Sequence, residues 1–228
     1  TLTRWGPKYE LALLEGVFDA IAFGGQSHMK FVMRHACSSW QAMPCGLVWN
    51  HEEVASFRND LPKRREVVFN HRWADEKRWQ EFCFLSKMLG KKTGYDFIFS
   101  TSGNEPNQGV IDACGINGIK IVVHRSKKDY YGWLANAALV WSGADQETFG
   151  YSFMEAIALG CRVVAPDRAA YPDHFLKAGL APSDYLYGAD DPMGMMALRR
   201  TMHDSDNGGE NGIVPERISA QYTGSVDA

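Results

Sequence analysis

A chain of 228 residues is long enough for one or two domains with a sizeable hydrophobic core. Hydrophobic residues make up 45% of it, charged residues 22%, and the formal net charge is −3. This balance argues against binding to nucleic acid through an overall positive charge. Binding through a local basic patch, Lys63-Arg64-Arg65, is not excluded, although such runs are more often solvated surface. No apolar run is long enough to cross a membrane, and no signal peptide is visible.

The five cysteines are odd in number and widely scattered, and no CxxC pair occurs among them. That pattern argues against a disulfide framework or a zinc site and predicts a cytoplasmic protein in a reducing compartment. GxSxG, Walker, HExxH and GxGxxG motifs do not occur in the sequence. The hypothesis of a dinucleotide-dependent dehydrogenase therefore lacks the motif that would be its main support.

The first part of the chain is predicted to contain helices and short strands. Residues 9–23 are expected to form a helix that runs into a strand-like segment, Phe18–Phe23. A helix over His28–Cys37 and a strand over Pro44–Trp49 follow. Residues 50–65 are polar, charged and interrupted by proline, so they are the best candidate for a linker.

From residue 66 onward, strands and helices alternate regularly. The predicted strands are Glu66–Phe69, Asp96–Ser100, Ile119–Val123, Ala138–Trp141 and Arg162–Ala165, and the predicted helices are Lys77–Leu89, Gln108–Gly115, Lys127–Asn136 and Ser152–Leu159. This alternation indicates an α/β fold, a Rossmann-like parallel sheet with helices on both faces. In such sheets ligands bind beyond the carboxyl ends of the strands. A polar, glycine-rich tail is expected from Asp204.

The most informative segment runs from Glu147 through an aromatic-glycine turn to Glu155 on the following helix. At about 3.6 residues per turn, Glu155 comes back to the side on which Glu147 precedes the helix. The free N–H groups of a helix N-terminus favour phosphate, and carboxylates accept hydrogen bonds from sugar hydroxyls. The segment therefore suits a ligand that carries both a phosphate and a sugar.

Arg72 and Lys77 bracket the start of a helix after the strand that ends at Phe69. An arginine fork and a lysine charge at this place would form a two-cation cleft for a diphosphate leaving group. The alternative is that Arg72 lies on the surface and Lys77 pairs with Asp75 or Asp129.

Two further strand ends give weaker signals. Ser102-Gly103 lies in an expected turn, where hydroxyls and a glycine let a ligand approach the backbone. His124-Arg125 ends the next strand, where a base-sized ligand has room against the main chain beside Tyr130 and Tyr131. The alternative is that His124 is structural and that at least one tyrosine packs the helix.

The segment from Glu147 to Gly160 resembles the donor-site motif of retaining GT-B glycosyltransferases, family 4-like, group 1. A closer likeness, to the tRNA-queuosine mannosyltransferase group, is carried by Phe69–Trp73, Ser126–Tyr131, Gln146–Gly150 and Tyr171–Asp173. The resemblance covers residues 65–190 well.

The resemblance implies three regions along the chain. Residues 1–64 would be the remnant of an N-terminal acceptor-side domain and a linker, residues 65–203 a nucleotide-sugar-binding Rossmann-like domain, and residues 204–228 a polar tail. Most of the first domain of a GT-B enzyme would then be missing. The chain is expected to be a fragment, a natural truncation or one half of a composite site.

The resemblance also implies an activity, the metal-independent retaining transfer of a hexose from a nucleotide-diphosphate sugar to an acceptor hydroxyl. The acceptor is unknown, and a modified nucleobase in tRNA or DNA is one candidate. No cofactor beyond the donor substrate is implied, and the departing phosphate would take the acceptor proton. The implied catalytic residues are Glu147, Arg72 and Lys77, and the implied donor-binding residues are Arg72, Lys77, Ser102, Gly103, His124, Arg125, Thr148, Phe149, Gly150, Tyr151 and Glu155.

Two alternatives from other classes stay open. A nucleotide-sugar-binding module without catalysis is favoured by the missing N-terminal half. A sugar-nucleotide epimerase of the same GT-B architecture is the second. The donor sugar, its base and the oligomeric state cannot be read from the sequence.

Overall fold

The computed structural model describes residues 20–23, 41–44, 49–103, 106–209 and 217–218. Two short strands, β1 (Ala20–Phe23) and β2 (Gln41–Pro44), pair in parallel near the start of the chain. β1 confirms the end of the predicted strand-like segment. β2 ends where the strand predicted over Pro44–Trp49 begins, and Trp49 lies outside any strand. The helices predicted before β1 and over residues 28–37 lie outside the described residues.

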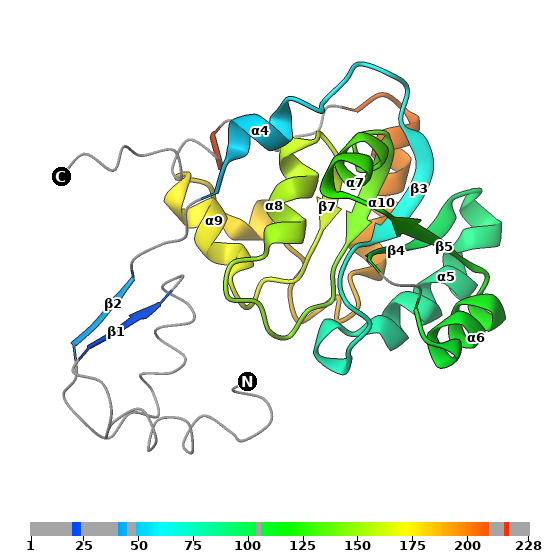
Figure 1. Ribbon diagram of the computed structural model, residues 1–228, viewed down its shortest axis with the longest axis horizontal. Helices are drawn as coiled ribbons and strands as arrows, with labels where there is room; N and C mark the ends of the chain where they lie inside the picture. The colour runs from blue at the N-terminus through cyan, green and yellow to red at the C-terminus, as the bar shows by residue number, and fades with distance from the viewer. Residues whose placement is uncertain (1–19, 24–40, 45–48, 104–105, 210–216, 219–228) are drawn as a thin grey trace.

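A parallel sheet of five strands forms the centre of the molecule (Figure 1), in the order β5-β4-β3-β6-β7. The strands are β3 (Arg64–Phe69), β4 (Asp96–Ser102), β5 (Ile119–His124), β6 (Ala137–Trp141) and β7 (Arg162–Val164). Each neighbouring pair is parallel, which confirms the predicted α/β, Rossmann-like fold class. The five predicted strands are therefore all present, with bounds that differ by a few residues.

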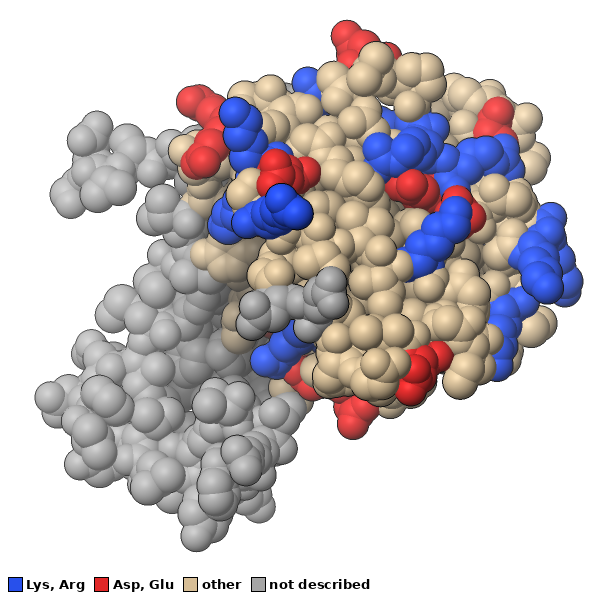
Figure 2. Space-filling view, turned by 45° about the vertical axis from the view of Figure 1, so that its right-hand side comes forward, with Lys and Arg blue, Asp and Glu red and all other residues tan. Residues whose placement is uncertain are grey.

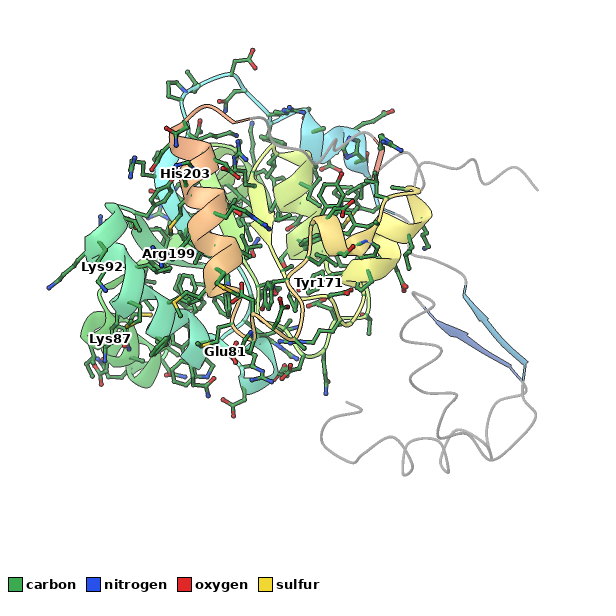
Figure 3. All side chains as sticks on the ribbon, turned by 180° about the vertical axis from the view of Figure 1, so that it is seen from behind. Glu81, Lys87, Lys92, Tyr171, Arg199 and His203 are labelled. Carbon is green, nitrogen blue, oxygen red and sulfur yellow. The ribbon has the colours of Figure 1, made fainter. Side chains whose placement is uncertain are left out.

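Helices cover both faces of the sheet. They are α4 (His51–Ala55), α5 (Trp79–Thr93), α6 (Gln108–Asn117), α7 (Lys127–Leu134), α8 (Tyr151–Ala158), α9 (Tyr171–Lys177) and α10 (Met195–Asp206), and the 3-10 turns are η1 (Asp75–Lys77) and η2 (Pro182–Asp184). Figure 1 shows α7 and α8 in front of the sheet, and Figure 3 shows α5 and α10 on the opposite side.

The core is divided by the sheet because successive side chains of a strand point to opposite faces. On β3, Val68 packs in a cluster with α7, α8 and α9. Its neighbours Val67 and Phe69 pack in a second cluster with α5, α6 and α10. The same alternation on β6 sends Val140 to the first cluster and Trp141 to the second. Strands buried on both faces explain why the sequence shows continuous apolar runs there.

The order of the strands places a topological switch point between β3 and β6. From β3 the chain proceeds outward to β4 and then β5, and it returns to add β6 on the other side of β3. Connections on the two sides leave a crevice at the carboxyl ends of these two strands, where ligands bind in open α/β sheets.

The segment predicted as a linker, residues 50–65, contains a helix that the sequence analysis did not predict. Residues 51–55 form α4, whose first turn is capped by Asn50, since the Asn50 side chain accepts a hydrogen bond from the Glu53 N–H at 3.1 Å. The acidic residues in the first turn interact favourably with the positive end of the helix dipole. Val54 is buried in the core. The segment is thus a short anchored helix followed by the start of β3.

Other element bounds also differ from those predicted. The helix expected from Lys77 begins at Trp79, because Arg78 has a left-handed backbone (φ 58°) that separates η1 from α5. The turn expected over residues 100–104 begins only at Gly103, because β4 continues through Ser102. α10 runs through Asp206, beyond the residue where the tail was expected to start. The Asp206 carboxylate anchors this helix end by accepting a hydrogen bond from Tyr95 at 3.0 Å.

The basic run Lys63-Arg64-Arg65, at the start of β3, contacts the ends of three helices. The amine of Lys63 donates to the carbonyls of Ala135 and Leu159, the C-terminal caps of α7 and α8. Arg64 donates to the Trp133 carbonyl in the last turn of α7 at 2.9 Å, and Arg65 donates to the Thr93 carbonyl at the end of α5 at 2.6 Å. Cations at helix C-termini satisfy free carbonyls and oppose the negative end of the dipole.

Replacing Lys63 by methionine is expected to lower the free energy of unfolding by about 1–3 kcal/mol, because two carbonyls at helix ends lose a charged donor. Lys120→Met is the matched control, since the ion pair of Lys120 with Asp96 is on the surface. That control should cost less than about 1 kcal/mol. Urea unfolding of the two variants measures the difference, and equal losses would contradict the role of Lys63.

Candidate functional site

Polar side chains converge at the carboxyl ends of β3 and β6. Asn70 and His71 directly follow β3, and Ser142 directly follows β6. Helix α8 begins nearby, because the Ser152 carbonyl accepts a hydrogen bond from the Asn70 side chain at 3.0 Å. The crevice expected from the strand order is therefore lined by hydrogen-bonding groups.

His71 lies at the centre of this group and is 6% exposed. Its Nε2 atom is 2.9 Å from Ser142 Oγ, and its Nδ1 atom is 3.2 Å from Ser152 Oγ. Burial, together with the positive charge of Lys77, lowers the pKa of His71 to about 3. The imidazole is therefore neutral at ordinary pH.

Lys77 and Glu147 form a buried ion pair beside His71. The Lys77 amine is 2.5 Å from Glu147 Oε1 and donates a second hydrogen bond to the Gln146 carbonyl at 2.5 Å. The two side chains are 8% and 15% exposed. Glu147 Oε1 also lies 4.0 Å from His71 Nδ1. The partner of Lys77 is therefore Glu147, and neither Asp75 nor Asp129 takes that place.

Arg72 occupies a different environment. Its side chain is 73% exposed and forms an ion pair with Glu76, one helical turn along the chain. The structure thus places one of the two predicted cations on the surface and buries the other. The diphosphate cleft predicted for Arg72 and Lys77 therefore stays a prediction.

Glu155 lies on α8 and contacts α7. Its Oε1 atom accepts a hydrogen bond from the Tyr131 hydroxyl at 2.9 Å, and the residue is 9% exposed. Burial raises the pKa of Glu155, while hydrogen bonds from the two tyrosines of α7 and the charge of Lys127 lower it. Tyr131 is buried in the core, as the packing alternative predicted. Tyr130 joins the same polar group by accepting a hydrogen bond from Asn70 at 2.8 Å.

The turn before α8 is held by His174. The His174 ring nitrogen Nε2 lies 2.5 Å from the Phe149 carbonyl, and burial lowers the pKa of His174 to about 4. Gly150 has a left-handed backbone (φ 83°), and a Cβ there would lie 3.2 Å from the Tyr171 ring. Helix α8 has no side-chain cap, and the Phe153 and Met154 N–H groups donate to the Gly150 carbonyl at 3.0 Å. Tyr151 and Thr148 are exposed at this turn.

The residues predicted at the β4 and β5 ends are placed differently. The ring of His124 is buried and bonded to Ser100 Oγ at 3.0 Å, which supports the structural alternative for this side chain. Ser102 ends β4, and the Gly103 N–H donates to the His124 carbonyl at 3.2 Å. Arg125 is exposed. These residues lie at the carboxyl ends of β4 and β5, on the β4 side of β3.

Sequence reasoning missed three buried members of the site: His71, Ser142 and Tyr171. Tyr171 is fully buried, and its hydroxyl lies 2.7 Å from Ser142 Oγ. A usable signal existed for His71 and Ser142, since each is the polar residue that ends or directly follows an apolar strand. Nothing in the local pattern placed Tyr171 next to them.

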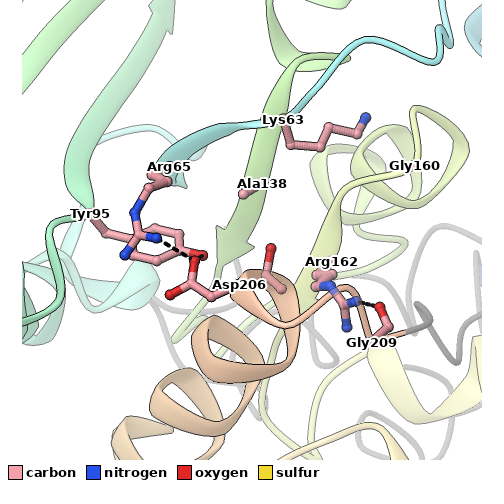
Figure 4. Close-up of a pocket in the computed structure, with 9 residues that line it drawn as sticks. Lys63, Arg65, Tyr95, Ala138, Gly160, Arg162, Asp206 and Gly209 are labelled. Carbon is pink, nitrogen blue, oxygen red and sulfur yellow. Dashed lines mark hydrogen bonds and ion pairs between the residues drawn. The ribbon is translucent and has the colours of Figure 1, made fainter.

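A separate cavity of about 360 Å³ lies at the opposite, amino-terminal edge of the sheet (Figure 4). It is lined by Lys63, Arg65, Tyr95, Ala138, Gly160, Arg162, Ser205, Asp206 and Gly209. Its cations are held by Asp206 and by backbone carbonyls. Figure 2 shows Lys and Arg over the right-hand part of one face with carboxylates between them, so no continuous basic field forms there. This cavity is distinct from the crevice at the carboxyl edge.

No protein-family model matches the chain. Among solved structures, sucrose-phosphate synthase from Thermosynechococcus elongatus is similar with a TM-score of 0.69 and 16% identity, over 95% of this chain and 57% of that one. S. aureus TarM in complex with UDP gives 0.68 and 14%, over 95% and 43%. A UDP-forming trehalose-phosphate synthase from Burkholderia xenovorans gives 0.59 and 12%, over 95% and 57%.

The chain thus spans about half the length of these structures. At such identities the likeness shows the fold alone, the Rossmann-like architecture of the C-terminal half of GT-B proteins. Within the described residues, no helix is long and apolar enough to span a membrane.

Stability is expected to fall between about pH 6.5 and pH 5. Unfolded histidine binds a proton near pH 6.5, whereas folded His71 and His174 do so only near pH 3 and 4, so acid favours the unfolded state. Each imidazole should cost roughly 2 kcal/mol over that interval. His174→Gln, whose amide can still donate to Phe149, should show a shallower decline in urea unfolding at stepped pH. An unchanged slope would contradict the buried neutral state of His174.

Proposed function

We propose that this chain binds a nucleotide-diphosphate sugar at the carboxyl edge of its sheet. It would act in glycosyl transfer, in which the sugar moves to an acceptor hydroxyl. One observation carries the proposal: the buried pair of Lys77 in η1 and Glu147 lies at the switch point, and Glu147 is in the loop that leads to the uncapped N-terminus of α8. A phosphate-binding helix start, a cation and a hydroxyl-binding carboxylate are what a sugar diphosphate requires. The UDP complex of TarM and the UDP-forming synthase, which share the fold, support it.

Each side chain has a role that its position permits. The N–H groups around Phe149, Gly150 and Tyr151 would bind phosphate oxygens, and Lys77 would neutralise the diphosphate as it leaves. Glu147 would accept hydrogen bonds from the sugar. Arg72 is available to the diphosphate, because an exposed ion pair such as that with Glu76 is cheaply broken.

The nucleoside would lie along the edge formed by α7, β4 and β5. Glu155 would bind the ribose hydroxyls, and the backbone at Ser102-Gly103 and His124-Arg125 would face the base. Glu155 accepts a hydrogen bond from Tyr131, so ribose binding would require the carboxylate to share that hydrogen bond or to release it.

The finer points of the proposal come from the resemblance of the motifs. Transfer would proceed with retention and without a metal ion, and the departing phosphate would take the acceptor proton. The acceptor would be a hydroxyl on a modified nucleobase in tRNA or DNA, and the protein would work in the cytoplasm. Activity that is unchanged in EDTA is the expected result for metal independence.

The direct test is calorimetry of the chain with UDP, GDP and ADP and with their sugars, followed by product analysis. Saturable binding of one nucleotide diphosphate supports the proposal, and binding of none of them overturns it. Binding with neither hydrolysis nor transfer indicates a binding module, and an isomerised donor indicates an epimerase. Arg199→Ala, on the exposed face of α10 far behind the crevice (Figure 3), is the control for non-specific charge effects.

Two variants of the ion pair should act in opposite directions on nucleotide-diphosphate binding. Glu147→Gln releases the Lys77 charge, so the diphosphate should bind at least as tightly while transfer falls about 100-fold. Lys77→Met should weaken diphosphate binding about tenfold or more, since a charge-assisted contact is lost. Dissociation constants and single-turnover rates check both, and parallel changes in the two variants would contradict the assignment.

A further inference from the structure

A chain of buried hydroxyl and imidazole groups runs from α9 to the first turn of α8. Tyr171 is fully buried, Ser142 is 2% exposed and His71 is 6% exposed. The atoms in sequence are Tyr171 Oη, Ser142 Oγ, His71 Nε2, His71 Nδ1 and Ser152 Oγ, separated by 2.7 Å, 2.9 Å and 3.2 Å at the three hydrogen bonds. Counting the protons of these groups fixes the direction of every bond.

The count begins at Tyr171. Within the described chain its hydroxyl has one hydrogen-bond partner, Ser142 Oγ, and burial raises the pKa of the phenol well above its ordinary value, so the proton is present. A fully buried O–H that points at no acceptor is costly. Tyr171 therefore donates to Ser142.

The direction of the hydrogen bond between Ser142 and His71 follows from the other contacts of Ser142. Its oxygen accepts from Tyr171 and also from the Ala144 N–H at 3.2 Å, which occupies both lone pairs of a hydroxyl. Its own proton is directed to the remaining neighbour, Nε2 of His71, which must be unprotonated in order to accept it.

His71 is neutral, because it is buried beside the Lys77 charge. With Nε2 as the acceptor, the single ring proton lies on Nδ1 and is donated to Ser152 Oγ. Ser152 is half-buried in the first turn of α8, and no described residue accepts its own hydroxyl proton. That proton is therefore available to a ligand.

We infer that Tyr171 is a positioning residue which, through Ser142 and the Nδ1–H tautomer of His71, makes the Ser152 hydroxyl a hydrogen-bond donor to a phosphate oxygen of the bound ligand. The phosphate assignment rests on the proposed function, and the direction of the relay does not. With the opposite tautomer Ser152 would donate to His71 and offer the ligand an acceptor, which suits a sugar hydroxyl. The two tautomers thus select different ligand groups.

The position of the proton can be measured in the unliganded wild-type chain. Long-range ¹H–¹⁵N correlation spectra of the protein labelled at histidine distinguish a protonated ring nitrogen from an unprotonated one. The signal of His71, one of seven histidines, is the one absent from His71→Asn. A protonated Nδ1 and an unprotonated Nε2 are expected. A protonated Nε2 would overturn the relay, whatever the chain binds.

The second experiment measures the affinity for UDP, GDP and ADP by calorimetry in Ser152→Ala, Tyr171→Phe and the double variant. Ser152→Ala should weaken the nucleotide diphosphate that binds by about tenfold, and Tyr171→Phe by a smaller factor. The double variant should bind no more weakly than Ser152→Ala, because Tyr171 acts through Ser152. Tyr171→Phe should also let the His71 ring take up the second tautomer in the same spectra.

Matched controls are available on the far side of the sheet. Tyr95→Phe removes a buried hydroxyl that is bonded to Asp206, and Ser86→Ala removes one bonded to the Asn117 carbonyl. Both should leave affinity unchanged. Unaltered affinity in Ser152→Ala, or independent losses that multiply in the double variant, would overturn the inference. If no nucleotide diphosphate binds the wild-type chain, the proposed function and the phosphate role of Ser152 fail together, while the His71 spectra still decide the relay.

Discussion

The crevice depends on one buried ion pair, Lys77 with Glu147. It joins the turn after β3 to the loop after β6, and these are the two strands between which the direction of the chain switches. Removing one partner would leave a buried charge uncompensated, so the pair constrains both loops at once. Burial keeps the neighbouring imidazole of His71 neutral, and the positive charge of Lys77 acts in the same direction. The ion pair therefore affects both the geometry and the protonation of the carboxyl edge.

The helix ends at the two edges of the sheet differ in their side-chain contacts. At the amino-terminal edge, Lys63, Arg64 and Arg65 bind the last carbonyls of α5, α7 and α8, so the negative helix ends are satisfied within the protein. At the carboxyl edge, α8 begins at Gly150 without a side-chain cap. The C-terminal end of α8 is thus bonded to a side chain of the protein, whereas its N-terminal end lacks a side-chain cap.

The sequence predicted the five strands and most helices of the Rossmann-like domain, because buried strands and amphipathic helices leave periodic apolar patterns. It missed α4, whose signal is a single cap at Asn50, as well as α9 and α10, and it misplaced the start of α5, where Arg78 adopts a left-handed backbone. Of the candidate site, Glu147, Lys77 and Glu155 were proposed from residue spacing and resemblance. Strand order is not a local property, so the meeting of His71, Ser142 and Tyr171 could not be foreseen from the chain alone.

The contrast between exposed Arg72 and buried Lys77 has a kinetic consequence. Under the proposed function, an approaching anion would meet the 73% exposed side chain of Arg72 before the buried Lys77, although each cation already has a carboxylate partner. Surface charge acts on the rate of association and is screened by salt, whereas a desolvated charge acts on the rate of dissociation. Arg72 would therefore act mainly on how often a ligand arrives, and Lys77 on how long it stays.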